Sequence, residues 1–159
     1  NKRYPDKSKN FTPTCDTNEI QSCTQQQLTN TYDNTILYID YMVDKTIKLL
    51  QSKQDKFTTS LVYLSDHGES LGENGVYLHG LPWSIAPETQ KHVPMLIWLS
   101  PDYQQRYGVS SQCLQQRAKT DPYSQDNLFS TLLGLLGVNT HEYQAADDIL
   151  TPCRSETAR

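Results

Sequence analysis

The sequence predicts an α/β fold with a mostly parallel sheet, and three observations indicate this class. Apolar residues recur at steps of three and four over residues 28–50, which is typical of an amphipathic helix. Two short apolar runs, Ser60–Leu64 and Val93–Leu99, have the length and composition of strands buried on both faces. A second helical pattern covers residues 125–136. Helices that alternate with buried strands favour an α/β arrangement.

The first helix has a clear start. Thr24 and Gln27 have the pattern of a capping box, in which each side chain binds a backbone N–H at the helix N-terminus. The apolar stripe of this helix consists of Leu28, Tyr32, Ile36, Ile39, Val43, Ile47 and Leu50. The opposite face, which we expect to be solvated, carries Asn30, Asp33, Asp44 and Lys48.

The segment between the two strands, residues 65–92, contains several Gly and Pro residues and no clear period. Irregular loops of this length in a compact domain are usually functional or disordered. Pro94 is tolerable in the second strand only near its start. The helix over residues 125–136 is followed by Gly137, where a C-terminal cap belongs.

Composition limits the class of protein. The 159 residues suffice for one domain or a large piece of one, and the mean hydropathy of −0.67 is that of a soluble protein. A net charge of −4 argues against a nucleic-acid partner. No apolar run approaches the roughly 18 residues of a membrane span, and no signal peptide is visible. Because the chain begins at Asn1 without a Met, we expect it to be a piece of a longer polypeptide, and neither absence excludes an anchor or export signal upstream.

The four cysteines, Cys15, Cys23, Cys113 and Cys153, contain no Cys-x-x-Cys spacing, which disfavours a zinc ribbon or a thioredoxin-type pair. A disulfide between Cys15 and Cys23 could close a short polar loop, leaving Cys113 and Cys153 to pair across a longer one. Four cysteines permit three connectivities, and four free thiols in a reducing compartment are the alternative.

Asp66 and His67 directly follow the first predicted strand, at the end of a strand where α/β proteins bind ligands. A carboxylate oxygen and an imidazole nitrogen form a mixture of ligands that zinc accepts. Adjacent strand residues point to opposite faces, so both side chains reach one metal only if the chain turns. We expect Gly68 to supply the backbone freedom for this turn, and His79 to return a second imidazole to the same region.

Simpler interpretations of these residues exist. An Asp-His pair at a strand end often forms only a hydrogen-bonded turn, and Glu69, Glu73 and His79 could be ordinary polar loop residues. Ser65 and Ser70 could be nucleophiles, but neither lies in a Gly-x-Ser-x-Gly elbow. Residue chemistry alone therefore leaves zinc binding open.

Three blocks in the chain carry a resemblance to a known family. The segment Ser65–Gly80, which reads SDHGESLGENGVYLHG, resembles the signature of bacterial phosphoethanolamine transferases, and so do Lys9–Cys15 and Thr29–Thr35. The resemblance is nearest to the enzymes that modify lipid A, including the mobile colistin-resistance type. It covers nearly the whole chain and is least specific after about residue 100. Other members of the superfamily would share the Asp-His-Gly core but not the surrounding sequence.

The resemblance implies an alkaline-phosphatase/sulfatase-like α/β/α sandwich, of which residues 1–159 would be the C-terminal part of a periplasmic catalytic domain. By position, Asp66 and His67 match zinc ligands, whereas Glu69 and His79 match residues that line the substrate site and take part in catalysis. His79 could also meet a further zinc ion. The Cys15–Cys23 pair matches a family disulfide, and the pairing of Cys113 with Cys153 is our own inference.

The implied reaction is a zinc-dependent transfer of phosphoethanolamine from phosphatidylethanolamine to a lipid A phosphate, through a covalent Thr intermediate. That Thr and a Glu zinc ligand would lie outside this chain, as would the region that anchors the enzyme in the bacterial inner membrane. Resistance to polymyxins such as colistin would follow. The alternatives are a related hydrolase or phosphoglycerol transferase of the sulfatase superfamily, and a metal-free periplasmic binding fragment.

Overall fold

A computed structural model describes residues 4–155 of the chain, which form two compact units. Within the described residues, the first unit comprises residues 4–52 and 61–98, and the second comprises residues 53–60 and 99–155. The candidate site residues Asp66, His67, Glu69 and His79 all belong to the first unit.

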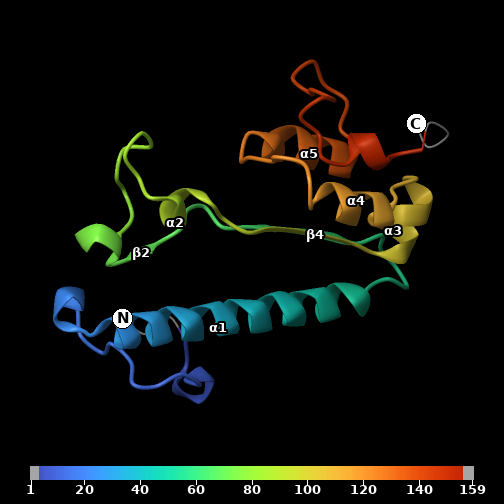
Figure 1. Cartoon of the computed structure of the whole chain (residues 1–159). Helices are drawn as coiled ribbons and strands as arrows, with labels where there is room; N and C mark the ends of the chain where they lie inside the picture. The colour runs from blue at the N-terminus through green and yellow to red at the C-terminus, as the bar shows by residue number, and fades with distance from the viewer. Residues whose placement is uncertain (1–3, 156–159) are drawn as a thin grey trace. The chain divides into compact units, whose positions relative to one another are not determined.

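The longest element of the first unit is α1 (Gln25–Gln51; Figure 1). The predicted capping box is present, because the Thr24 side chain accepts a hydrogen bond from the Gln27 amide and the Gln27 side chain accepts one from the Thr24 amide. The expectation that Asn30 is solvated is wrong. Its side chain is buried, and its amide group donates to the Pro13 carbonyl oxygen at 2.8 Å.

Side chains of α1 hold the N-terminal segment through backbone hydrogen bonds. Asn34 is fully buried; its Oδ1 accepts from the amides of Asn10 and Phe11 at 2.8 and 2.9 Å, and its Nδ2 donates to the Phe11 carbonyl at 2.8 Å. Thr31 Oγ1 accepts from the Cys15 amide at 2.8 Å. A segment without sheet partners thus satisfies its backbone groups on polar helix side chains.

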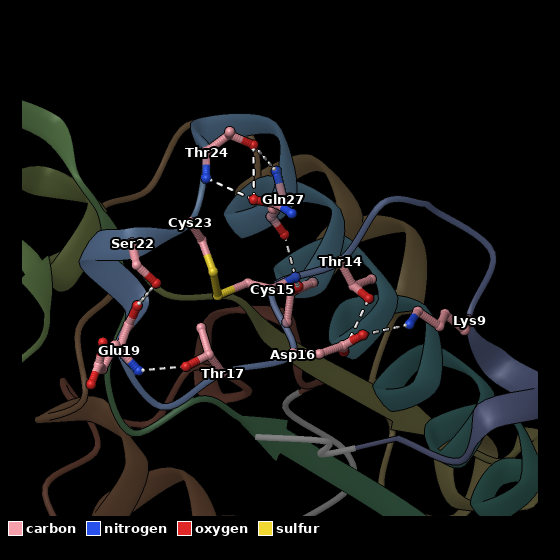
Figure 2. Close-up of a disulfide and its surroundings, with 11 residues drawn as sticks. Lys9, Thr14, Cys15, Asp16, Thr17, Glu19, Ser22, Cys23, Thr24 and Gln27 are labelled. Atoms are coloured by element: carbon pink, nitrogen blue, oxygen red, sulfur yellow. Dashed lines mark hydrogen bonds and ion pairs between the residues drawn. A yellow bond between two sulfur atoms is a disulfide. The ribbon is translucent and has the colours of Figure 1, made fainter.

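A disulfide joins Cys15 to Cys23, with the Cα atoms 5.7 Å apart (Figure 2). This is the pairing that the family resemblance implies. The loop that it closes contains the short 3-10 helix η2 (Ile20–Ser22), and a second one, η1 (Asp6–Ser8), precedes it in the chain. An ion pair between Lys9 Nζ and Asp16 Oδ2, 3.1 Å apart, joins the residue that follows η1 to the residue that follows Cys15.

The strands β1 (Ser60–Leu64) and β4 (Met95–Leu99) pair with each other, as Figure 1 shows. Beyond one end of the pair the Ser100 amide donates to Thr59 O, and beyond the other end the Ser65 amide donates to Pro94 O. Partner numbers therefore fall on one strand as they rise on the other, so the two strands are antiparallel. The second strand begins at Met95 rather than at the predicted Val93.

Two features of this strand pair differ from the sequence-based expectation. The pair is antiparallel within a sheet that was expected to be mostly parallel, because the connection from β1 to β4 folds back as loops and short elements instead of crossing over as a long helix. All residues of β1 and most of β4 are half-buried rather than buried. A sheet of two strands within this chain offers too little surface to bury both faces of each strand.

The segment expected to be a long loop contains regular structure. The strands β2 (Ser70–Leu71) and β3 (Tyr77–Leu78) form a small antiparallel hairpin around the 3-10 turn η3 (Glu73–Gly75), and a short helix α2 (Glu88–Lys91) follows. The turn needs glycine at Gly72, whose φ of +116° is rarely adopted by residues with a Cβ.

The second unit contains three helices among its described residues: α3 (Pro101–Arg106), α4 (Ser111–Arg117) and α5 (Asn127–Leu136). The predicted C-cap of α5 is present, since Gly137 has a φ of +65°. The Cys113–Cys153 disulfide ties α4 to the 3-10 helix η4 (Thr151–Cys153), which confirms the inferred pairing. Within residues 4–155, every helix is too short or too polar to cross a membrane.

Candidate metal and substrate site

The site begins where β1 ends, and local hydrogen bonds shape the turn there. Ser65 Oγ donates to the His67 carbonyl oxygen at 2.9 Å, and Asp66 Oδ1 accepts from the His67 amide at 3.1 Å. These bonds turn the chain immediately after the strand, as is required if adjacent side chains are to serve one site.

Gly68 is needed in this turn for a reason that the sequence did not reveal. Its φ lies outside the left-handed region, so the expected role in backbone freedom is wrong. A Cβ at this position would overlap the Thr89 carbonyl oxygen and lie 2.9 Å from the carbonyl carbon of Thr89. The close approach lets the Gly68 amide donate to Gln90 O at 3.0 Å, which fixes the turn to α2.

Ser70 provides a second hydrogen bond between α2 and the segment that follows β1. Its side chain is buried, its Oγ accepts from Gln90 Nε2 at 2.9 Å, and it lies 3.3 Å from Thr89 Oγ1. A hydroxyl that is buried and hydrogen-bonded in this way is a structural group, which removes Ser70 from the candidate nucleophiles.

The hairpin brings three candidate ligands together. His67, Glu69 and His79 each offer one ligand atom, and these atoms lie within 4.8 Å of one another. The imidazole rings of His67 and His79 stack, with centroids 3.7 Å apart, and His79 Nδ1 lies 2.8 Å from Glu69 Oε2. Pairing of β2 with β3 produces this approach, because it places His79, which follows β3, beside Glu69, which precedes β2.

The hydrogen bonds of the two imidazoles engage the same nitrogen atom, Nδ1, in each ring. Nδ1 of His67 lies 2.9 Å from Gly68 O, an atom that can only accept, so Nδ1 carries the hydrogen. By the same reasoning Nδ1 of His79 donates to the Glu69 carboxylate. In both rings Nε2 is then the nitrogen that can bind a metal ion or a substrate oxygen.

Asp66 stands next to this group but is not one of its three members. Its side chain is 89% exposed, and its Oδ2 lies 3.8 Å from Nε2 of His67, on the same side as the nitrogen that can bind a metal. The structure thus puts all four predicted residues in one region. Their separate roles as metal ligands or substrate-site residues stay predictions.

The donor set fits zinc. Imidazole nitrogen and carboxylate oxygen are ligands that zinc binds at about 2 Å, and partly exposed side chains leave room for further ligands. The backbone and carboxylate partners of the two Nδ1 atoms are the outer hydrogen bonds that usually orient metal-binding histidines. The described residues can therefore hold a metal ion.

Tyr32 of α1, which the sequence places in the apolar stripe and in the block Thr29–Thr35, is a neighbour of the site. Burial raises the pKa of the Tyr32 hydroxyl, and the nearby Glu69 carboxylate raises it further. The helix α1 also contacts β2. Because the apolar stripe and the site motif lie far apart in sequence, only the folded arrangement reveals that they meet.

Comparison with known proteins gives the class to which this fold and site belong. The sequence model of the sulfatase family matches residues 1–138, and the chain therefore belongs to the sulfatase family.

Curated relatives narrow the similarity within this family. The chain is 79% identical over 152 residues to the phosphoethanolamine transferase EptA of Salmonella typhimurium, with 96% of this chain and 28% of that protein aligned. It is 48% identical over 97 residues, 61% of this chain and 18% of the relative, to the phosphatidylethanolamine transferase Mcr-1 of Escherichia coli. The chain thus spans 28% of the length of its relative EptA. These similarities confirm the resemblance inferred from the three sequence blocks.

Solved structures confirm the fold class. The soluble domain of lipooligosaccharide phosphoethanolamine transferase A from Neisseria meningitidis superposes with a TM-score of 0.92 at 50% identity, covering 96% of this chain and 46% of that one. The periplasmic domain of EptC from Escherichia coli, solved in complex with zinc, superposes with a TM-score of 0.71 at 25% identity, covering 97% of this chain and 42% of that one. The chain has the alkaline-phosphatase-like α/β fold of this family.

Proposed function

We propose that this chain is the C-terminal part of the periplasmic catalytic domain of an enzyme that transfers phosphoethanolamine from phosphatidylethanolamine to lipid A. The observation that carries the proposal is the convergence of His67, Glu69 and His79 beside Asp66, in a chain that is 79% identical to a phosphoethanolamine transferase. The resident metal in this proposal is zinc, bound by Asp66 and His67.

The metal and the imidazoles have separate tasks. When bound, zinc supplies Lewis acidity, which lowers the pKa of the attacking hydroxyl and neutralises charge on the phosphoryl oxygens. The bond from His67 Nδ1 to Gly68 O leaves Nε2 as the nitrogen with which this residue would hold the metal. Gly68 packs closely against Thr89 and donates a hydrogen bond to Gln90, which fixes the turn that carries Asp66 and His67. The turn is therefore already ordered before the reaction, so little entropy is lost in positioning it.

His79 and Glu69 serve proton transfer. In the first displacement the hydroxyl oxygen of a threonine outside this chain bonds to phosphorus, and the bond from phosphorus to the diacylglycerol oxygen breaks. The proton of the threonine must end on the diacylglycerol oxygen. His79 Nε2 can carry it, because Glu69 fixes Nδ1 as the donor of the other ring hydrogen at 2.8 Å. In the second displacement an oxygen of a lipid A phosphate bonds to phosphorus, the bond from phosphorus to the threonine oxygen breaks, and the threonine oxygen regains a proton.

The proposed setting is the bacterial inner membrane, with the catalytic domain in the periplasm. Two disulfides in a chain of this size support an oxidising compartment. Addition of phosphoethanolamine lowers the negative charge of lipid A, which weakens its attraction for cationic polymyxins and would confer colistin resistance.

A transfer assay on the complete polypeptide tests the proposal. Wild-type protein should move a labelled ethanolamine headgroup from phosphatidylethanolamine to lipid A, and crystals should give an anomalous peak at the zinc edge about 2 Å from Asp66 and His67. Asp66→Ala should lose both transfer and metal, whereas Glu69→Gln should keep the metal and lose rate. Full activity in Asp66→Ala would refute the zinc assignment.

The products of the assay distinguish the proposed transfer from the alternative reactions. Release of free phosphoethanolamine without lipid A modification would indicate a related hydrolase, and transfer of phosphoglycerol would indicate the neighbouring transferase class. If the protein binds no metal and transfers no group, the remaining alternative is a metal-free periplasmic binding fragment.

A further inference from the structure

An exposed apolar segment directly adjoins the candidate site. We call Leu78–Ile85 the apolar loop. Four of its large side chains are exposed: 51% for Leu78, 38% for Leu81, 74% for Trp83 and 66% for Ile85. Single exposed apolar residues are common, but such a concentration within eight consecutive residues marks an interaction surface.

The apolar loop presents these side chains on an ordered turn. The amides of Ile85 and Ala86 both donate to Pro82 O, at 3.0 and 2.9 Å, and Ala86 is buried at the base of the turn. Proline at the start of the turn restricts the backbone further. Because the turn is closed by its own hydrogen bonds, Trp83 and Ile85 are held outward instead of folding back onto the first unit.

Both ends of the apolar loop are attached to the site. His79, which pairs with Glu69, is its second residue. Beyond its other end lies α2, whose Gln90 accepts from the Gly68 amide and donates to Ser70. A surface bound by this loop is therefore held at a fixed place relative to the site residues.

The composition of the apolar loop suits a lipid surface. No Asp, Glu, Lys or Arg occurs between Glu73 and Glu88. Nζ of Lys91 lies 5.3 Å from the centroid of the Trp83 ring and 2.8 Å from the Glu88 carboxylate, so the charges at the base of the loop are paired. An indole that carries an apolar body and one N–H donor is the side chain most typical of the membrane–water interface.

We propose that the apolar loop inserts into the interfacial layer of a lipid bilayer and holds the site at the level of the lipid headgroups. The choice of a bilayer as the occupant rests on the proposed function, in which both substrates are lipids. The phosphate of such a lipid lies at the boundary between headgroup and acyl chain, and a loop that dips its apolar tip below that boundary brings His79 to the phosphate.

Binding to vesicles tests this inference in the complete catalytic domain without the proposed membrane anchor, since the soluble domain of a relative crystallised by itself. Every tryptophan except Trp83 is replaced by Phe, Trp98 among them, so that the emission reports on Trp83 alone. Vesicles of phosphatidylethanolamine and phosphatidylglycerol should shift the Trp83 emission to the blue, and bromine-labelled acyl chains should quench it. A variant with Trp83→Ser and Ile85→Ser, made in the unaltered chain, should partition at least about tenfold more weakly, because two large apolar side chains no longer enter the lipid. Leu49→Gln, which alters a residue of α1 that is 58% exposed, is the matched control and should partition normally.

Kinetics separate this inference from the proposed function. The double variant should lose transfer on vesicles by about the same factor but keep the wild-type rate with short-chain donors dispersed in detergent. Absence of transfer in the wild-type protein with every donor would refute the proposed function, while vesicle binding by Trp83 would still hold. Equal vesicle partitioning of the double variant and wild type would overturn the inference. A Trp83 emission that is already blue-shifted without lipid would also overturn it, because protein would then cover the loop.

Discussion

The substitution Gly68→Ala tests whether the turn after β1 depends on close packing against α2. The new Cβ would overlap the Thr89 carbonyl oxygen and lie 2.9 Å from its carbonyl carbon and 3.1 Å from the Gln90 Cα. All three are backbone atoms, which cannot rotate away. Since non-bonded carbon atoms pack at about 3.5–4.0 Å, the two segments must separate by roughly 1 Å.

Two costs follow from that separation. Overpacking of this kind costs about 1–3 kcal/mol, and loss of the hydrogen bonds from Gly68 to Gln90 and from Gln90 to Ser70 adds about 1 kcal/mol each. The expected loss of stability is thus about 3–5 kcal/mol. His67 is adjacent to the displaced residue, and misplacement by about 1 Å can lower the rate of a catalysed reaction roughly 100-fold.

Urea denaturation gives the loss of stability, and the lipid A transfer assay gives the loss of rate. Gly137→Ala is the control in the second unit: its Cβ would meet no atom within 4 Å, but its φ is +65°. That variant should lose only roughly 1–2 kcal/mol of stability, which is the cost of a left-handed backbone conformation for a residue with a Cβ, and it should keep its transfer rate. If Gly68→Ala is as stable and as active as wild type, the close approach to Thr89 does not exist in solution and the argument for a clamped site fails.

Three further predictions concern the fold. Asn34→Ala should cost about 2–4 kcal/mol in urea denaturation, because it removes three backbone hydrogen bonds, whereas Asp40→Ala on the exposed side of α1 should change little. Replacing Cys113 and Cys153 together by Ser should lower the stability of the oxidised protein by about 3–4 kcal/mol, since the disulfide closes a loop with a sequence separation of 40; a reductant should then have a smaller effect on the variant than on wild type. Burial raises the pKa of the Tyr103 hydroxyl, so the neutral form stabilises the fold below the ordinary pKa of tyrosine and that contribution is lost as pH rises through the higher folded pKa. Tyr103→Phe should therefore reduce the fall in melting temperature above pH 10, and an unchanged alkaline profile would contradict this assignment.

Features that depend on neighbouring residues were predictable from the sequence. The capping box at Thr24, the strand Ser60–Leu64 and the cap at Gly137 follow from residue types a few positions apart, and all three are present. The site motif was visible for a related reason, because Asp66 and His67 stand in a distinctive run of residues directly after a strand.

Apart from the pairing of Cys113 with Cys153, features that depend on residues distant in sequence were not predictable. Asn30 looked like a solvated helix residue, but its burial depends on where the segment containing Pro13 lies. The antiparallel pairing of β1 with β4 depends on the path of the intervening segment, which periodicity does not describe.

The sequence by itself determined the helices α1 and α5, the strands β1 and β4 and the identity of the candidate ligands, since these depend on local periodicity, capping and residue chemistry. Only the tertiary structure decided that His67 and His79 stack, that Gly68 must lack a Cβ because of Thr89, and that the apolar loop adjoins the site. The physical reason is that such contacts form between segments whose separation along the chain carries no information about their distance in space, until hydrogen bonds and packing fix it.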